Sequence, residues 1–265
     1  MSTRRSDRSA QDDSAPARRR LLLVRHGAVD YFDADGRPHP PDTVPLTTQG
    51  VAQARALGAA LARADVRIDR AISSGLPRTQ MTMQHLLAAG ALLSGNAPTE
   101  HWPELQEIRG ARLEDIAEPD LKKTFTAAFA GPVPLATRFL NGETIGELLA
   151  RVLPAVQRLL ADRSWDTALI VAHGGVNRAL LSWFLAGEPV FFGGLAQDPG
   201  ALNIIDIATP DESDGQVDEG RQIAAASVVR VVNYCALEPL QTQSRLSTME
   251  HLLGQYRRWR TQRSS

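Results

Sequence analysis

The fold is decided by Leu21-Leu22-Leu23-Val24-Arg25-His26-Gly27, an unbroken apolar run that leads into an arginine, a histidine and a glycine. A second run of the same kind is Ala168-Leu169-Ile170-Val171-Ala172-His173-Gly174-Gly175. Such short apolar runs are typical of strands buried on both faces, as in a parallel sheet covered by helices. Ligands bind beyond the carboxyl ends of these strands. If the two strands are neighbours, their histidines meet at one edge, and the preceding arginine indicates a phosphoryl site.

Composition narrows the function classes. The chain has 265 residues, of which 43% are hydrophobic, so it can bury a full core in one large or two small domains. Its 29 basic and 30 acidic residues nearly balance, so we expect neither a nucleic-acid nor a membrane partner. The single cysteine, Cys235, excludes an internal disulfide framework, argues against a cysteine-ligated metal site and favours a reducing compartment.

The N-terminal segment carries arginine clusters but no export signal. The apolar run from Leu21 to Val24 is too short for a signal core, and no stretch approaches the roughly 20 apolar residues that span a bilayer. We therefore expect a cytoplasmic protein. Residues 1–18, rich in Ser, Arg, Asp and Ala, are predicted to form a disordered tail, because they have almost nothing to bury.

The remaining chain alternates strand and helix patterns. Apolar spacing and caps predict a helix after Thr47 or Thr48 and another that opens at Pro77. Further helices are predicted at 143–161 and 176–185, and strands at 69–73, 202–207 and 224–232. This alternation predicts a three-layer α/β/α sandwich with a mostly parallel central sheet, as one domain over residues 19–240.

Three segments depart from the alternation. Residues 98–140 contain five prolines and a helical piece near 121–129, and so long a connection is typical of a lid or binding insert. Residues 209–222 are predicted to be a solvated acidic loop. Residues 241–265 are predicted to form a C-terminal helix and tail. This segment packs either on the domain or on another subunit, and in the second case the protein is a homodimer.

The ordered motifs resemble the histidine phosphatase superfamily, also called phosphoglycerate mutase-like. The resemblance rests on Arg25-His26-Gly27 after a strand, Arg78 at the head of a helix and His173-Gly174 after a later strand. It extends over residues 20–208, through Leu46-Thr47-Thr48-Gln49-Gly50 with Gln53-Ala54, Ser73-Ser74 and Gly142-Glu143-Thr144. The resemblance implies a phosphoglycerate mutase-like fold and a phosphohistidine mechanism.

The residue chemistry favours the same site. A phosphomonoester is a dianion, and Arg25 and Arg78 supply two planar forks of donors that balance its charge. Neutral His26 can attack phosphorus through one ring nitrogen, while His173 donates to the oxygens as charge develops. We predict phosphate binding by these four residues and Gly174, and we expect neither a metal nor a cofactor.

Hydrolysis also needs an acid that protonates the leaving oxygen and then activates water. The family places this carboxylate in a Leu-x-Glu pattern, so the resemblance implies Glu107, with Glu104 as the rival. The sequence departs from the family here: a glycine comes one residue early, and Arg112-Leu113-Glu114-Asp115 replaces an aromatic-rich stretch.

A second departure follows the nucleophile, where Phe32 stands at the place of a polar phosphate-binding residue. Tyr31 and Phe32 are predicted to contact the organic part of a substrate or to pack in the core. Basic residues that could meet a second anionic group are Lys122, Lys123 and Arg138.

These features predict a metal-independent phosphatase that acts on a small phosphomonoester through phospho-His26. The alternative is a phosphoglycerate mutase, which returns the phosphoryl group to bound product. A third hypothesis is a non-catalytic, protein-binding member, which the presence of both arginines and both histidines disfavours. Nothing in the sequence identifies the substrate.

Overall fold

A computed structural model describes residues 18–33, 35–95, 97, 99–208, 219–240 and 246–264. The predicted N-terminal tail, apart from Arg18, and most of the predicted acidic loop lie outside these residues.

The core of the molecule is a six-stranded sheet with the order β5-β3-β6-β1-β7-β8. Its strands are β1 (Arg19–Arg25), β3 (Arg70–Ser73), β5 (Thr99–His101), β6 (Thr167–Ala172), β7 (Leu202–Ile207) and β8 (Val228–Tyr234). The first four run parallel, whereas β7 and β8 are antiparallel to their neighbours. A separate two-stranded pair consists of β2 (Arg67–Ile68) and β4 (Leu92–Leu93). The prediction of a mostly parallel sheet is confirmed.

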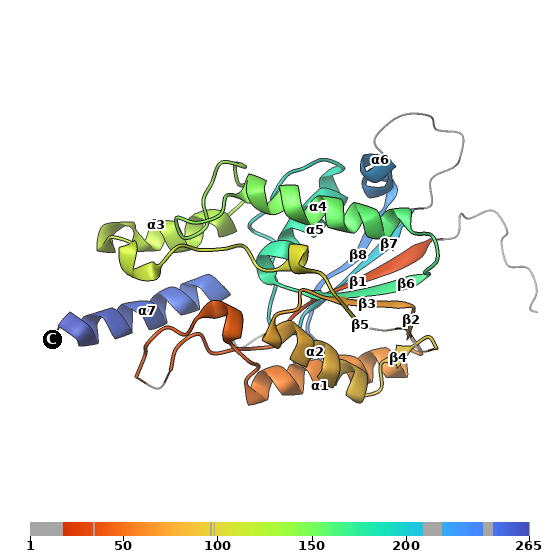
Figure 1. The fold of residues 1–265 in the computed structure, drawn as a ribbon, viewed down its shortest axis with the longest axis horizontal. Helices are drawn as coiled ribbons and strands as arrows, with labels where there is room; N and C mark the ends of the chain where they lie inside the picture. Colours follow the sequence, from red (N-terminus) through yellow and green to blue (C-terminus); the bar gives the residue numbers. More distant parts are fainter. Residues whose placement is uncertain are drawn as a thin grey trace, which may run out of the picture.

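Helices cover both faces of this sheet (Figure 1). One face carries α1 (Thr48–Arg63) and α2 (Pro77–Ala88), and the other carries α4 (Ile145–Ala161), α5 (Gly174–Ala186) and α6 (Glu219–Ala226). Thr47 caps α1 by accepting a hydrogen bond from the Gly50 N–H, and Pro77 occupies the first position of α2. The predicted three-layer sandwich is therefore present.

Both faces of β1 are apolar because both are covered. Leu22 and Val24 pack in the cluster beneath α1 and α2, whereas Leu21 and Leu23 pack in the cluster beneath α4 and α5. Successive strand residues point to opposite faces. The unbroken apolar run of the sequence thus fills two separate halves of the core.

The pairing of β1 with β6 sets the position of both histidines. Arg25 is aligned with Ala172, and the His26 N–H donates to the Ala172 carbonyl at 3.0 Å. His26 and His173 therefore leave the sheet side by side at the carboxyl edge, as the sequence predicts.

The insert and the C-terminal helix form a second structure beyond this edge. The insert contains α3 (Leu121–Thr126), and α7 (Thr248–Ser264) packs against it through Phe125, Tyr256 and Trp259 (Figure 1). Short 3-10 turns connect the elements at Pro41–Thr43, Pro103–Leu105, Leu113–Asp115, Glu118–Asp120 and Ala127–Phe129. The sequence predicts that the C-terminal helix packs on the domain or on another subunit, and in the structure it packs on its own chain.

Two predicted boundaries near the C-terminus are wrong. The predicted strand at 224–232 begins only at Val228, and the predicted acidic loop at 209–222 overlaps α6 from residue 219. Alanine is the strongest helix former, and α6 ends in three alanines after Ile223. Ile223 and Ala224 are buried in the core cluster under α4 and α5, so burial favours the helix here.

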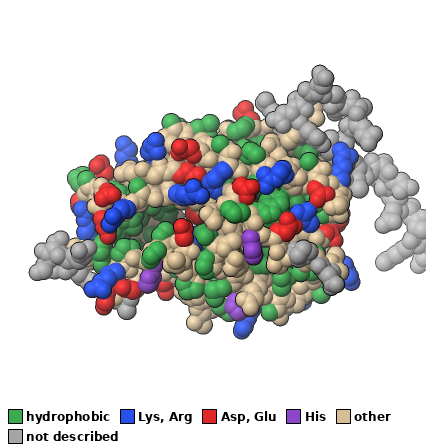
Figure 2. Space-filling view, in the orientation of Figure 1, with side chains coloured by type: hydrophobic (Ala, Val, Ile, Leu, Met, Phe, Trp, Pro, Cys, Tyr) green, Lys and Arg blue, Asp and Glu red, His purple; other side chains and the backbone are tan. Residues whose placement is uncertain are grey.

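The visible surface mixes charges of both signs. In Figure 2, Lys and Arg side chains alternate with Asp and Glu across this face, with hydrophobic side chains between them. Among the described helices, none is long and apolar enough to cross a bilayer. Within the same residues, no three His, Cys, Asp or Glu side chains form a group suited to a metal ion.

The close contact of α1 and α2 yields a stability prediction. A Cβ at Gly58 would lie 2.1 Å from the Leu86 carbonyl oxygen, so Gly58→Ala must push the helices apart. We expect it to lower the free energy of unfolding by about 2 kcal/mol, as overpacking does. Urea titration followed by circular dichroism measures this.

The matched control is Gly254→Ala in α7, where only the flexible end of Arg258 lies within 4 Å of the added Cβ. Because alanine favours helix, this variant should be as stable as the wild type or more stable. Equal destabilisation by both substitutions would contradict the assigned helix contact.

Candidate active site

Four predicted residues come together at the carboxyl edge of the sheet. Arg25 ends β1 and His26 follows it, Arg78 lies in the first turn of α2, and His173 links β6 to α5. Their exposed fractions are only 6%, 1%, 2% and 0%. The two imidazole centroids are 5.2 Å apart, with an interplanar angle of 64°. Two arginines and two histidines are therefore buried around one point.

Arg25 is anchored on one side only. Its Nη1 donates to the Gln197 carbonyl and, at 2.9 Å, to Thr248 Oγ1 on α7. Its Nε is buried and has no hydrogen-bond partner within the described chain. Gln197 is in turn held by Asn203, through a bond of 2.8 Å from Nε2 to Oδ1. The edge formed by Nε and Nη2 of Arg25 therefore remains available to an anion.

Arg78 follows the same pattern. Its Nη1 donates to the Pro41 carbonyl at 2.6 Å, whereas its buried Nε lacks a partner among the described residues. A buried guanidinium that leaves a donor unpaired incurs a desolvation penalty, which an anionic ligand would relieve. The two arginines thus form a preorganised oxyanion site.

His26 has one ring nitrogen fixed and the other free. Its Nδ1 lies 2.8 Å from the Gly27 carbonyl oxygen, which only accepts, so Nδ1 carries the proton. Burial, with the charges of Arg25 and Arg78 adding to it, holds the pKa of His26 well below its usual value. The ring is therefore neutral near pH 7, and Nε2 carries the lone pair that a nucleophile needs.

His173 is held by hydroxyl groups that the sequence analysis did not interpret as functional. Its Nε2 lies 2.8 Å from Ser74 Oγ, which lies 3.0 Å from Thr79 Oγ1. Its Nδ1 is buried without a partner in the described structure, and burial, followed by the charge of Arg78, lowers its pKa well below the usual value. When Ser74 donates to Nε2, the neutral ring carries its proton on Nδ1 and can donate to an anion.

Glu107 reaches the site at the N-terminus of α5. Its Oε1 and Oε2 accept from the Gly175 N–H at 3.0 and 3.2 Å, and Oε1 also accepts from the Ile108 N–H. These backbone donors hold the side chain at the start of α5. A Cβ at position 175 would lie 2.5 Å from Oε1, so glycine there leaves space for the acid.

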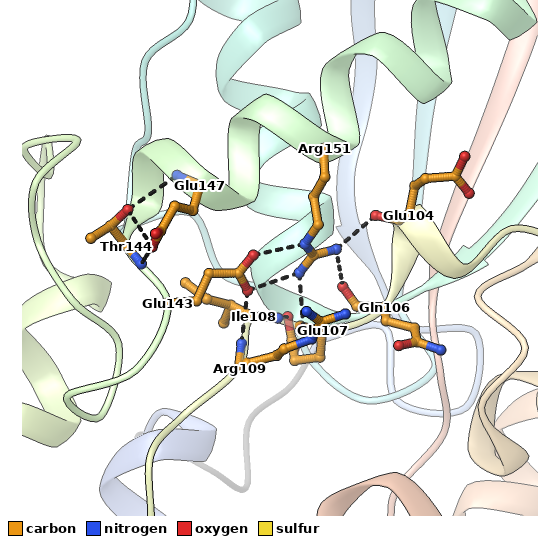
Figure 3. Close-up of polar contacts among 9 residues, drawn as sticks. All are labelled: Glu104, Gln106, Glu107, Ile108, Arg109, Glu143, Thr144, Glu147 and Arg151. Atoms are coloured by element: carbon orange, nitrogen blue, oxygen red, sulfur yellow. Dashed lines mark hydrogen bonds and ion pairs between the residues drawn. The ribbon is translucent and has the colours of Figure 1, made fainter.

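The rival carboxylate lies elsewhere. Glu104 pairs with Arg158 at 3.0 Å on the surface. Figure 3 shows its side chain turned away from Glu107, on the far side of Arg151. The structure therefore brings Glu107, and not Glu104, to the end of α5.

Arg151 of α4 holds the segment that carries Glu107 (Figure 3). It donates to the carbonyls of Glu104, Gln106 and Glu107 at 2.6, 2.7 and 3.1 Å. Its guanidinium also pairs with both oxygens of Glu143, at 2.7 and 3.0 Å. The sequence analysis missed Arg151, because nothing in the local pattern of α4 shows that it faces another loop.

The Gly142-Glu143-Thr144 motif now has a structural reason for each residue. A Cβ at Gly142 would lie 2.3 Å from the Arg109 carbonyl, so the backbones touch. Glu143 pairs with Arg151. Thr144 begins α4 with a capping box, in which its hydroxyl accepts from the Glu147 N–H and its own N–H donates to the Glu147 carboxylate.

A further buried arginine was also missed. Arg178 of α5 donates to the carbonyls of Gly174 and Gly193, both at 3.1 Å, and lies over the Phe129 ring. Burial, with Arg25 nearby, lowers its pKa to about 10, so it stays charged at neutral pH. Gly174 itself is close to Arg25, since a Cβ there would lie 3.6 Å from the Arg25 Nε.

The two aromatic residues after the nucleophile have different surroundings. Phe32 packs against the apolar cluster of α3 and α7, so it does not replace a phosphate ligand. Tyr31 lines a cavity with Arg25 and His26. The three basic residues predicted as partners of a second anion are exposed and are not among the described residues lining this cavity: Lys122, Lys123 and Arg138.

The chain is similar in sequence to proteins of known families. The sequence model of the histidine phosphatase superfamily (branch 1) matches residues 21–213. A 2,3-bisphosphoglycerate-dependent phosphoglycerate mutase from Rhizobium etli is 31% identical over 60% of this chain and 77% of its own. An adenosylcobalamin/alpha-ribazole phosphatase from Salmonella typhi is 30% identical over 71% of this chain and 90% of its own.

Among solved structures, a mycobacterial glucosyl-3-phosphoglycerate phosphatase has a similar fold. It superposes with a TM-score of 0.57 at 20% identity, over 81% of this chain and 98% of that one.

The lowered pKa values of both histidines predict a pH-dependent stability. Below about pH 6.5 the unfolded chain binds protons that folded His26 and His173 resist, so the free energy of unfolding falls as pH decreases. Each such group adds a slope of up to about 1.4 kcal/mol per pH unit. Urea unfolding between pH 7.5 and 5 should show a shallower slope for His26→Asn than for the wild type. Identical slopes would contradict the assigned burial of a neutral His26.

Proposed function

This chain belongs to the histidine phosphatase superfamily (branch 1), and we propose that it is a metal-independent phosphatase acting on a small phosphomonoester through phospho-His26. Its relatives are phosphatases and mutases, so it is an enzyme of phosphoryl hydrolysis or transfer. The observation that carries the proposal is neutral His26, whose Nε2 has no partner among the described residues, beside two arginines whose buried Nε atoms also lack a partner there.

Binding places the phosphoryl group between the two guanidinium forks. Arg25 and Arg78 each present an Nε–Nη2 edge, which fits two oxygens of a phosphate. His173 donates from Nδ1 to an equatorial oxygen, and Gly174 lies close to Arg25 at the start of α5. The positive charges balance the dianion, so the mechanism requires no metal ion for this purpose.

The first chemical step transfers the phosphoryl group to the enzyme. The lone pair on His26 Nε2 forms the N–P bond while the ester P–O bond breaks. The Gly27 carbonyl, which accepts from Nδ1, stabilises the positive charge that develops on the ring. Protonated Glu107 donates its proton to the leaving oxygen, which departs as an alcohol.

The second step releases phosphate. Glu107, now a carboxylate, accepts a proton from water as the water oxygen attacks phosphorus. The N–P bond breaks, and the electron pair returns to His26 Nε2. Arg151 supports both steps by holding the backbone of residues 104–107, and it is a positioning residue.

A phosphoglycerate mutase is the second candidate, because the Rhizobium etli relative carries that name. Both activities use the same cradle and differ in what accepts the phosphoryl group. Incubation with 3-phosphoglycerate and a trace of the 2,3-bisphosphate separates them. We expect that any 3-phosphoglycerate consumed yields inorganic phosphate; isomerisation to 2-phosphoglycerate without net phosphate release would contradict the phosphatase proposal.

The remaining proposals concern the surroundings of the enzyme. We propose that it works in the cytoplasm on a small phosphorylated molecule, and not on a nucleic acid or a membrane surface. The near balance of basic and acidic residues supports this proposal. A non-catalytic role is disfavoured, because both arginines, both histidines and the carboxylate of Glu107 are all retained at one site.

Replacement of the nucleophile gives the first functional prediction. His26→Asn should reduce phosphatase activity by about 10⁴-fold or more, because the other imidazole at the site, His173, has its Nε2 bonded to Ser74 and a proton on Nδ1. A ³²P-labelled ester should label the wild-type protein with an acid-labile, alkali-stable phosphate and leave this variant unlabelled. His85→Gln, in the last turn of α2, is the control and should label normally. Labelling of His26→Asn would overturn the assignment.

Replacement of Glu107, the proposed acid, gives the second functional prediction. Glu107→Gln should lower kcat by about 10²–10⁴-fold for alkyl phosphates and by much less for 4-nitrophenyl phosphate, whose leaving group needs little protonation. Glu104→Gln is the matched control and should change neither rate. Equal losses on both esters would assign Glu107 a structural role.

A further inference from the structure

We propose that the cavity beside His26 binds the organic part of the substrate and selects an uncharged, hydroxyl-bearing group over one with a second anion. This inference rests on the proposed phosphatase function and adds the substrate class.

The cavity has the right place and size. Its volume is about 560 Å³, within the usual range for small-molecule sites, and Arg25 and His26 form part of its wall. Its other walls are the residues after the nucleophile, the first turn of α1, the segments 198–200 and 235–238, and the N-terminal half of α7. The organic group of an ester whose phosphoryl group is bound beside His26, before transfer, can extend into this space.

Tyr31 connects the cavity with the phosphate cradle. It lines the cavity, and burial raises the pKa of its hydroxyl while the charges of Arg78 and Arg25 oppose that shift. Its side chain is therefore within electrostatic reach of both arginines. Within the described chain no hydrogen bond engages the Tyr31 hydroxyl, so it is available to the phosphate or to the first hydroxyl of the leaving group.

Much of the polar lining is neutral. Amide side chains come from α1 and α7, and hydroxyls come from both helices as well. These residues are Gln49, Gln53, Gln255, Thr47, Thr48 and Thr248. Gln53 Oε1 accepts from the Ala28 N–H at 2.8 Å, which fixes the side chain and leaves its amide N–H₂ to donate. Fixed amides and hydroxyls are suited to a ligand with several hydroxyl groups.

The charged lining is mostly acidic. Asp30, Asp198 and Glu238 border the cavity, and Arg25 is the one Lys or Arg among its described lining residues. The Nη1 of Arg25 is already bound to Gln197 and Thr248. From α7, the side chain of His251 also lines the cavity. Among the described lining residues, a carboxylate or second phosphate on the substrate would meet three carboxylates and no cation other than Arg25, and this repulsion selects against it.

The wall formed by α7 lies outside the part of the chain that the family model matches. The family model ends at residue 213, whereas Thr248, His251 and Gln255 come from α7. The helix is held in place by Tyr256, whose hydroxyl donates to the Leu113 carbonyl at 2.8 Å, and by Trp259 in the apolar cluster with α3. The proposed specificity therefore depends on a segment outside residues 21–213, the part of the chain that the family model matches.

A matched pair of substrates tests the charge rule. Glycerol 3-phosphate and 3-phosphoglycerate have the same carbon skeleton, and a hydroxymethyl group in the first replaces the carboxylate of the second. We expect kcat/KM for phosphate release to be at least tenfold higher for glycerol 3-phosphate. 4-Nitrophenyl phosphate, which has neither group, reports the phosphatase reaction itself.

Variants of the lining test its assignment. The double variant Asp30→Asn, Glu238→Gln should narrow the ratio between the two substrates by raising kcat/KM for 3-phosphoglycerate several-fold. Asp35→Asn is the control, since Asp35 is exposed in the same loop as Asp30 and does not line the cavity. Gln255→Leu should lower kcat/KM for glycerol 3-phosphate more than for 4-nitrophenyl phosphate.

The outcomes separate the two proposals. Hydrolysis of 4-nitrophenyl phosphate with equal or greater kcat/KM for 3-phosphoglycerate overturns the inference and leaves the phosphatase proposal intact. A ratio that Asp30→Asn, Glu238→Gln leaves unchanged overturns the role of these carboxylates. Absence of phosphate release from every ester overturns the proposed function and this inference with it.

Discussion

The parallel pairing of β1 with β6 is the constraint on which the site depends. One backbone register aligns Arg25 with Ala172, and the hydrogen bond from His26 to Ala172 continues it past the end of the strands. Two imidazoles that are 147 positions apart in the chain thereby have centroids 5.2 Å apart. A shift of one residue would turn every side chain of β1 to the opposite face. The register between β1 and β6 therefore fixes the geometry of the candidate site.

The charge at this edge is costly to bury, and the surrounding structure reduces that cost. Backbone carbonyls accept from one nitrogen of each arginine, at Gln197 for Arg25 and at Pro41 for Arg78. The remaining donors lack protein partners in the described structure, as expected of a site built for an anion. Burial, and after it the same charges, lower the pKa of His26, so the groups proposed to bind the phosphate also help to keep the proposed nucleophile neutral.

Local sequence patterns predicted the starts of helices correctly where the backbone requires a particular residue type at one position. Pro77 opens α2 and Thr47 caps α1, because these roles depend on backbone geometry within a single turn. Prediction failed for α6, where burial of Ile223 against the core outweighed the β pattern of its neighbours. It also missed Arg151, Ser74 and Thr79. Their partners lie on other elements, and local spacing carries no information about such contacts.

The sequence by itself determined the layered α/β fold and the two strand ends with their histidines, because apolar periodicity and strand-end motifs encode these features directly. Its resemblance to a family added the prediction that Arg25 and Arg78 complete the cradle. Only the tertiary structure distinguished Glu107 from Glu104, because two carboxylates three residues apart differ only in whether α5 or Arg158 lies beside them. The position of α7 beside the cavity is likewise visible only in the tertiary structure. That placement depends on aromatic packing between segments more than 120 positions apart, which no local pattern specifies.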